Sequence, residues 1–172
     1  MKTIKTYQPF RFKQFQIHQD KTAMKVGTDG VLLGAWADVL ESESILDIGT
    51  GTGLIALIIA QRNQNAMVDA VEIDESSYEQ AKQNFEESSW TKRLNIYQSS
   101  IQDYAKNCGK QYDLIVSNPP YFVNSTKSKQ EDKNQVRHTD SLSFEELIKS
   151  VNILLEISGR FVSFCLSLKV CF

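Results

Sequence analysis

The stretch LIVSNPPYF, residues 114–122, contains side chains that could hold a nitrogen-bearing substrate. Asn118 follows an apolar run and precedes Pro119 and Pro120, which have fixed φ angles and no backbone N–H. The groups left to face a ligand are mostly acceptors, namely the Asn118 side-chain oxygen and the Pro119 carbonyl. Such acceptors bind an N–H group, for example the amino group of an aromatic ring or an amide. Tyr121 adds a flat face on which a planar base could stack.

A second candidate site is the glycine-rich stretch LDIGTGTG, residues 46–53, which joins an apolar run to a segment of helical length. Glycines at 49, 51 and 53 would let the backbone approach a ligand, and the helix N-terminus would add N–H donors. The dinucleotide fingerprint GxGxxG requires glycine where Leu54 stands, and the lysine of a P-loop is absent. The pattern therefore favours a nucleoside ligand without a pyrophosphate. The alternative is a tight strand–helix turn that binds nothing.

Two acids end the next apolar segment, about twenty residues after the glycine loop. Glu72 stands where an acid at the tip of the second strand can accept ribose hydroxyls. Asp74 directly precedes Glu75, where an acid favours the dipole of the following helix. We therefore assign Glu72 to a ribose and Asp74 to the start of the helix.

Together these stretches predict a displacement reaction at a nitrogen atom. An amine on an aromatic ring is a poor nucleophile, because its lone pair is delocalised. Acceptors at Asn118 and Pro119 would push electron density back to the nitrogen and orient the lone pair. A methyl sulfonium held in line would complete the displacement, with proximity supplying most of the rate and no strong general base. A rigid Pro-Pro turn without chemistry is the alternative.

Alternating strand-like and helix-like segments after residue 43 would position these residues. We expect strands at residues 44–49, 66–74, 93–98, 112–117 and 159–166, and helices at 53–62, 75–88 and 143–156. The last helix would begin with Ser143 as its N-cap and Glu146 three residues later. This alternation predicts an α/β fold with a doubly wound, mostly parallel sheet covered by helices on both faces. In such a sheet Asn118 would lie beside the glycine loop.

The residues before 44 and the residues after the Pro-Pro turn follow other patterns. Residues 10–17 alternate apolar and polar side chains, which predicts a half-buried strand. Thr28 is placed to cap a helix over residues 29–40. Residues 122–141 are polar and charged, and a loop of that length is usually functional or mobile. We expect a single domain overall, with an N-terminal, substrate-side cap at 1–43 and a cofactor-binding core at 44–172.

Composition and charge limit the class of protein. The chain has 172 residues, of which 41% are apolar and 23% charged, as in globular domains. No apolar run approaches the roughly 18 residues that cross a bilayer, and the N-terminus lacks the apolar block of a secretion signal. Cysteines 108, 165 and 171 show no metal-ligand spacing. They predict reduced thiols in a cytoplasmic protein that binds neither metal nor membrane.

The net charge of −2 is unevenly distributed along the chain. Residues 1–25 hold six Lys or Arg against one acid, and residues 125–137 hold four against two, whereas residues 38–87 hold eleven acids. A polyanionic partner would favour the two basic segments. Solvated charged faces are the alternative when charge alone is considered.

The motifs LDIGTGTG, VEID and SNPPY, in this order, resemble the class I S-adenosylmethionine-dependent methyltransferases with an Asn-Pro-Pro-Tyr motif, which modify exocyclic or amide nitrogens. The stretches KVGTDGVLLGAWA and RHTDSLSFEEL resemble the bacterial tRNA1(Val) adenine N6-methyltransferases, which methylate the adenine beside the anticodon. The resemblance implies a Rossmann-like fold, S-adenosyl-L-methionine as cofactor and tRNA as partner. For the full-length family it implies a monomer.

The resemblance also implies roles for residues at matching positions. The residues that would bind the methionine end, the ribose and the adenine of the cofactor are Asp47, Gly49, Gly51, Gly53, Glu72, Ser100, Ile101 and Asn118. The residues that would close over the cofactor from the preceding segment include Lys25 and Thr28. The catalytic motif would be Asn118, Pro119, Pro120 and Tyr121. The substrate would be contacted by Tyr121, Phe122, Arg137 and His138. Ser100 departs from the family, because many members carry an acid there.

The end of the chain departs further from the family. The family sheet has seven strands, and the residues after the fifth expected strand are too few for strands six and seven. We therefore expect a C-terminally truncated sheet that lacks both of these strands. Two alternatives to an adenine in tRNA remain open: a methyltransferase acting on a protein glutamine amide or a ribosomal RNA guanine amine, and an inactive truncated domain. The basic segments favour RNA, because a protein substrate needs no positive surface.

Overall fold

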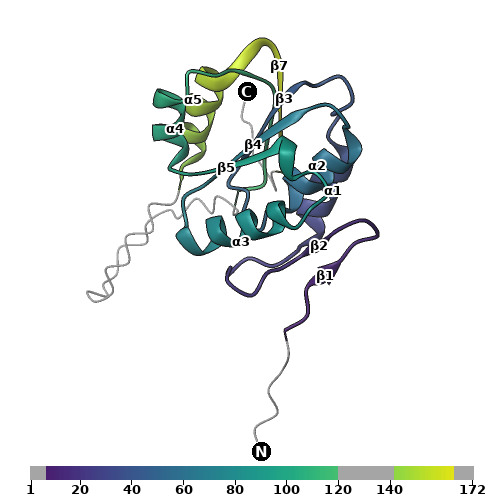
Figure 1. Ribbon diagram of the computed structural model, residues 1–172. Helices are drawn as coiled ribbons and strands as arrows, with labels where there is room; N and C mark the ends of the chain where they lie inside the picture. Colours follow the sequence, from purple (N-terminus) through teal and green to yellow (C-terminus); the bar gives the residue numbers. More distant parts are fainter. Residues whose placement is uncertain (1–6, 120–141, 165–172) are drawn as a thin grey trace, which may run out of the picture.

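The computed structural model of the chain describes residues 7–119 and 142–164. Its main sheet has five strands, all parallel to their neighbours (Figure 1). In spatial order they are β5 (Leu94–Gln98), β4 (Met67–Glu72), β3 (Ser44–Ile48), β6 (Tyr112–Ser117) and β7 (Leu155–Ser163). The doubly wound parallel sheet predicted from the alternation of segments is confirmed.

Five helices cover the two faces of this sheet (Figure 1). One face carries α1 (Thr28–Trp36), α2 (Leu54–Arg62) and α3 (Glu75–Glu86), and the other carries α4 (Ile101–Asn107) and α5 (Phe144–Leu154). Successive residues of β3 point into opposite layers, because side chains alternate across a strand. Ile45 packs in the cluster with Leu54 and Phe85, and Leu46 packs in the cluster with Tyr104 and Leu147. Burial on both faces explains why the strand sequences are continuous apolar runs.

Most predicted elements are present at their predicted places. The capping box at the start of α5 is confirmed: Glu146 N donates to Ser143 Oγ at 3.2 Å, and Ser143 N donates to Glu146 Oε2 at 2.9 Å. The fifth strand differs, since β7 follows α5 directly and ends at Ser163, whereas the prediction ran from 159 to 166. Helix α4 and a short 3-10 helix, Thr91–Arg93, were not predicted.

The prediction of one strand at residues 10–17 is wrong. These residues form a hairpin of two short antiparallel strands, β1 (Phe10–Arg11) and β2 (Gln16–Ile17), beside α3 (Figure 1). Phe12 N donates to Phe15 O at 2.9 Å, and the two rings stack with their centroids 4.5 Å apart. Phe12 and Phe15, which contribute to the alternating pattern, therefore stabilise the turn of the hairpin.

The prediction that Thr28 caps a helix is also wrong. Gly27 is the N-cap of α1 and Thr28 is its first residue, and no side chain accepts a hydrogen bond there. At the other end, Arg62 Nη1 donates to the carbonyl oxygens of Gly34 and Ala37, at 2.9 and 2.6 Å. Helix α1 thus ends at Trp36, before the expected limit at residue 40.

The strand labels in Figure 1 count the hairpin first, so β6 and β7 are present and are the fourth and fifth strands of the parallel sheet. The expectation that two further strands are lacking concerns residues after Phe164, which lie outside the described residues. The division of the chain at residues 43 and 44 stays a prediction. In the described ranges, no helix is both long and apolar enough to cross a membrane.

Candidate active site

The glycine loop connects β3 to α2 and has three residues in the left-handed region. Gly49, Gly51 and Gly53 have φ angles of 69°, 59° and 80°, which favour glycine because other residues are strained there. A Cβ on Gly53 would lie 2.5 Å from Cε1 of Phe85, so this glycine is needed for packing on α3. A Cβ on Gly49 or Gly51 would meet nothing within 4 Å, so these two border open space.

Asp47 is a fully buried carboxyl group directly before this loop. Its Oδ2 accepts a hydrogen bond from Thr50 Oγ1 at 2.6 Å, whereas its Oδ1 has no partner within the described residues. Burial raises the pKa of Asp47 to about 7, although the Thr50 hydroxyl and the backbone N–H of Ala56 oppose this, and the charge of Glu72 adds to it. A buried acceptor without a partner is costly, so a cationic donor placed here would be bound favourably.

Glu72 ends β4 and holds the glycine loop against the start of α3. Its Oε2 accepts from Gly51 N at 2.9 Å, and its Oε1 accepts from Ile73 N and Asp74 N at 2.9 and 3.0 Å. A carboxylate has about four acceptor positions, so about one is left for a ligand hydroxyl. The predicted ribose contact stays a prediction, and this loop-holding role was not foreseen. Asp74 is the N-cap of α3 and accepts from Ser77 N at 2.8 Å, as its assignment to the helix start predicted.

Asn118 lies at the carboxyl end of β6, in line with the end of the neighbouring strand β3. Ile48 of β3 is in register with Ser117, and Ser117 Oγ donates to Ile48 O at 2.9 Å. A Cβ built on Gly30 of α1 would lie 3.8 Å from Asn118 Nδ2. The structure therefore brings Asn118, the glycine loop and the first turn of α1 to one edge of the sheet.

The other predicted catalytic and substrate residues are only partly described. Pro119 follows Asn118 and is half-buried. The remaining predicted residues lie outside the described residues: Pro120, Tyr121, Phe122, Arg137 and His138. Their roles stay predictions.

The predicted residues before the loop and after β5 have local roles in the fold. Lys25 Nζ donates to the carbonyl oxygens of Gln19 and Thr22, and Thr28 is exposed at the start of α1. Ser100 is the N-cap of α4, where its Oγ donates to Asp103 Oδ2 at 2.8 Å. Ile101 is buried in the apolar cluster below this turn. Their predicted cofactor contacts are not tested by these bonds and stay predictions.

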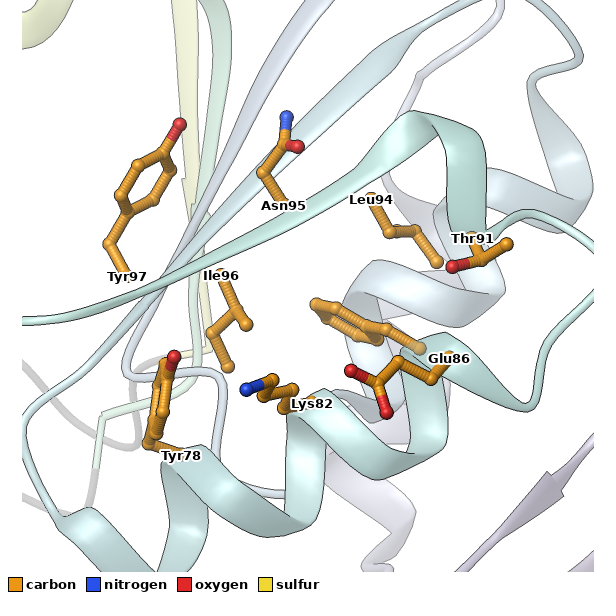
Figure 2. A pocket seen from close by; sticks show the side chains of 9 residues that line it. Tyr78, Lys82, Glu86, Thr91, Leu94, Asn95, Ile96 and Tyr97 are labelled. Carbon is orange, nitrogen blue, oxygen red and sulfur yellow. The ribbon is translucent and has the colours of Figure 1, made fainter.

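Two hollows, of about 360 and 490 Å³, lie along the edge strand β5 and not at the glycine loop. The first is lined from α3 by Tyr78 and Lys82 and from β5 by residues that include Ile96 (Figure 2). Neither lining contains Asp47, the loop glycines or Asn118. The chemistry of the partly satisfied carboxylate, and not the size of a hollow, therefore locates the candidate site.

The sequence analysis did not predict a role for three buried polar residues of α3, which contact the glycine loop and the N-terminal segment. Asn84 Nδ2 donates to Thr52 O at 2.8 Å, inside the glycine loop. The signal was present, because Ser77, Gln80 and Asn84 occupy one side of the helix where apolar residues are usual. In the described part of the chain, His, Cys, Asp and Glu side chains form no group of three or more that could hold a metal ion.

Comparison with known proteins identifies the family of the chain. Residues 23–150 match the model of the family described as the methyltransferase small domain. The chain belongs to the methyltransferase small domain family. This membership confirms the resemblance to methyltransferases that the glycine loop, the acidic strand end and the SNPPY motif predicted.

Two relatives with similar sequences are both named tRNA1(Val) (adenine(37)-N6)-methyltransferase. The chain is 51% identical to one from Flavobacterium psychrophilum over 151 residues and 55% identical to one from Trichodesmium erythraeum over 153 residues. These alignments cover 87% and 88% of the chain but 64% of each relative. The chain thus spans somewhat less than two thirds of the length of these relatives.

Solved structures confirm the Rossmann-like methyltransferase fold. A SAM-dependent methyltransferase from Thiobacillus denitrificans, in complex with S-adenosyl-L-homocysteine, superposes with a TM-score of 0.56 at 14% identity. The match covers 80% of this chain and 48% of that one. At this identity the likeness concerns the fold alone.

Proposed function

We propose that this domain transfers a methyl group from S-adenosyl-L-methionine to the N6 amine of an adenine in tRNA. The observation that carries the proposal is the placement of Asp47 and Asn118 at the ends of the adjacent strands β3 and β6. Asp47 supplies a buried acceptor without a partner beside the glycine loop. Asn118 supplies an amide where the amine of the substrate would lie. The names of the relatives that are 51% and 55% identical to this chain over the aligned residues support an adenine of tRNA as the acceptor.

The residues present fit the proposed cofactor. Asp47 Oδ1 would accept from the ammonium group of its methionine end, which would supply the partner that this oxygen lacks. The open space at Gly49 and Gly51 leaves room along the loop, and Glu72 would accept from the ribose. Ser100 and Ile101 would contact the adenine. When bound, the cofactor supplies a methyl group activated by a positively charged sulfur.

Asn118 and Pro119 would act on the substrate amine. The Asn118 side-chain oxygen and the Pro119 carbonyl would accept its two N–H bonds, which fixes the direction of the nitrogen lone pair. Positive charge develops on the nitrogen during attack, and acceptors already in place stabilise that charge. Pro119 has no backbone N–H, so it offers the amine no competing donor. Orientation of the nitrogen would contribute most of the rate, without a strong general base.

The residues outside the described ranges would contact the RNA. Tyr121 would stack on the adenine, since a planar base stacks on an aromatic face, and Phe122 would lie beside it. Arg137 and His138 would contact the substrate strand. A glutamine amide would suit Asn118 and Pro119 nearly as well. The basic residues near the N-terminus favour RNA, because phosphates are neutralised by Lys and Arg.

The test is the variant Asn118→Ala, measured for methyl transfer to tRNA and for binding of S-adenosyl-L-homocysteine. We expect transfer to fall by about a hundredfold or more, because the amine loses an orienting acceptor, while the dissociation constant for S-adenosyl-L-homocysteine stays within about threefold of wild type. Loss of binding in this variant would contradict the role of Asn118 as an acceptor for the substrate amine and would favour its other implied role, at the cofactor. A wild-type chain that binds S-adenosyl-L-homocysteine but methylates no tRNA would instead favour a binding domain without activity.

A further inference from the structure

Helix α3 carries a buried stripe of polar side chains, the α3 polar stripe, formed by Ser77, Gln80 and Asn84. Their exposed fractions are 8%, 0% and 1%. Spacings of three and four residues place them on one side of the helix. Buried polar groups require partners, so each of these side chains indicates what the helix is built to hold.

The partners of the α3 polar stripe include an N-terminal segment, residues 18–22, here called the anchor segment. Ser77 Oγ donates to Thr22 Oγ1 at 3.1 Å, and Gln80 Oε1 accepts from Lys21 N at 2.9 Å. With the two bonds between Asn84 and His18 described next, three of the four hydrogen bonds between the stripe and this segment involve backbone groups of the anchor segment. The stripe therefore fixes the backbone path of the anchor segment along α3 and depends little on which side chains that segment carries.

Asn84 connects the anchor segment to the glycine loop through one side chain. Its Oδ1 accepts from His18 N at 2.8 Å, and its Nδ2 donates to His18 O at 2.9 Å and to Thr52 O at 2.8 Å. Thr52 lies between Gly51 and Gly53, which both have left-handed backbones. An amide is the side chain that offers one acceptor and two donors together, whereas a carboxylate offers no donor and a hydroxyl offers one.

We propose that Asn84 is a positioning residue that sets the shape of the glycine loop and couples the loop to the anchor segment. The neighbouring residue Phe85 packs at Gly53, where an added Cβ would lie 2.5 Å from its ring. Helix α3 thus holds the loop by one hydrogen bond and one packed ring. A ligand that orders the loop then also orders residues 18–22, because both are bonded to the same amide. This inference deepens the proposed function and rests on it for the identity of the ligand.

A purely structural role for Asn84 is the alternative, and Asn63 provides a matched control. Asn63 is also a buried amide, with an exposed fraction of 4%. Its Nδ2 donates to Val39 O and Ser42 O at 2.6 and 2.7 Å, and its Oδ1 accepts from Ala66 N at 2.8 Å. It follows α2 at the end opposite the glycine loop, and a nine-residue helix is about 13 Å long. Each of the two asparagines thus donates two hydrogen bonds to backbone carbonyls, but Asn84 of α3 contacts the loop before the start of α2, whereas Asn63 lies at the end of α2.

The experiment compares Asn84→Asp with Asn63→Asp, which each keep the side-chain volume and remove two donated hydrogen bonds. Hydrogen exchange of the free protein reports the loop directly. In Asn84→Asp we expect the amides of Gly51, Gly53 and His18 to exchange about tenfold faster, because local opening becomes easier. In Asn63→Asp the same amides should change only as much as the rest of the core.

Calorimetric titration with S-adenosyl-L-homocysteine gives the second readout. We expect Asn84→Asp to weaken binding about tenfold, as the loss of a buried hydrogen bond predicts, and Asn63→Asp to bind as wild type does despite a lower Tm. In wild type, S-adenosyl-L-homocysteine should also slow exchange at His18 and Lys21, and Asn84→Asp should abolish this effect. If Asn84→Asp does not fold, Asn84→Ser with Asn63→Ser as control replaces the pair.

Unchanged loop exchange in Asn84→Asp would overturn the proposal, as would an equal effect of the Asn63 variant on the loop and on binding. The two hypotheses fail separately. A folded wild-type chain that binds no S-adenosyl-L-homocysteine would contradict the proposed function. The exchange comparison in the free protein would still decide whether Asn84 positions the loop.

Discussion

Asp47 shows what a buried carboxyl group at the candidate site costs the stability of the fold. Burial raises its pKa to about 7 from an ordinary value of 3.8. Between these two pH values the unfolded chain has lost the proton that the folded chain retains. The folded state binds more protons in this window, so the free energy of unfolding decreases as the pH rises from about 4 to about 7.

The variant Asp47→Asn should therefore gain stability over wild type as the pH rises, from about 1 kcal/mol at pH 4.5 to its full value at pH 8. One pKa unit corresponds to 1.36 kcal/mol, so the gain at pH 8 is at most about 4 kcal/mol. Urea unfolding from pH 4.5 to pH 8 measures this difference. The same pH dependence in wild type and variant would show that Asp47 does not titrate in this range. We expect the stabilised variant to bind S-adenosyl-L-homocysteine more weakly, because a neutral amide attracts an ammonium group less than a carboxylate does.

At the scale of elements, a buried carboxylate on β4 joins the strands on the side of the sheet that faces α4. Asp69 accepts from Asn95 Nδ2 of β5 at 2.8 Å, from Tyr112 Oη of β6 at 2.7 Å and from Lys110 Nζ at 2.9 Å. Tyr112 is in turn hydrogen-bonded to Tyr104 of α4. The hydrogen bond to Asp69 raises the pKa of Lys110. Burial is the largest cause that raises the pKa of Tyr112, and of Tyr104 as well.

Asp69→Ala should destabilise the protein by about 1–3 kcal/mol, because it leaves the buried Tyr112 hydroxyl and the half-buried Asn95 amide without their acceptor. The matched control is Lys110→Gln. The Lys110 side chain is 53% exposed, so losing its ion pair should cost about 1 kcal/mol or less. Urea unfolding at pH 7 measures both variants. A loss below about 1 kcal/mol in Asp69→Ala would show that water replaces the carboxylate easily and that the network does not join the strands.

The sequence predicted an element well where its hydrophobic pattern fits only one kind of secondary structure. The strand at 44–48 is a continuous apolar run followed by glycine, which a parallel strand buried on both faces requires. The hairpin was missed because FRFKQFQI alternates on both sides of Lys13 and Gln14, and this polar pair, where the chain turns, contains no glycine, asparagine or proline. Helix α4 has seven residues, too few to show a period, although Ser100 with Asp103 three positions later was a usable start signal.

The candidate site was predictable where chain order alone brings residues together. Parallel strands end at one edge, so the glycine loop, Glu72 and Asn118 were expected to meet there. The bonds that shape the loop were not predictable, because they join residues far apart in sequence. Gly51 bonds to Glu72 across 21 positions, and Asn84 bonds to Thr52 across 32. Which buried polar group meets which backbone carbonyl depends on packing, and no local pattern records it.

At the scale of the whole molecule, basic residues lie on two opposite sides of the sheet. Changing one set or the other alters the net charge equally, so a comparison shows whether the position of the charge matters. Arg11 and Lys13 are exposed on the hairpin, and Lys106 and Lys149 are exposed on α4 and α5, on the other side of the sheet. If tRNA is the partner, each phosphate contact that is lost lowers the salt dependence of binding by roughly one unit of slope. Position, and not total charge, then decides the effect.

The double variant Arg11→Glu with Lys13→Glu should weaken tRNA binding at least about tenfold at low salt and reduce the slope of log Kd against log salt by about 1–2. Binding of S-adenosyl-L-homocysteine should stay unchanged, because neither residue reaches the glycine loop through a described hydrogen bond. Lys106→Glu with Lys149→Glu changes the net charge equally and should leave the slope within about half a unit of wild type. Equal slopes in both double variants would mean that tRNA responds only to the overall field of the protein, and the hairpin would then not be a contact surface.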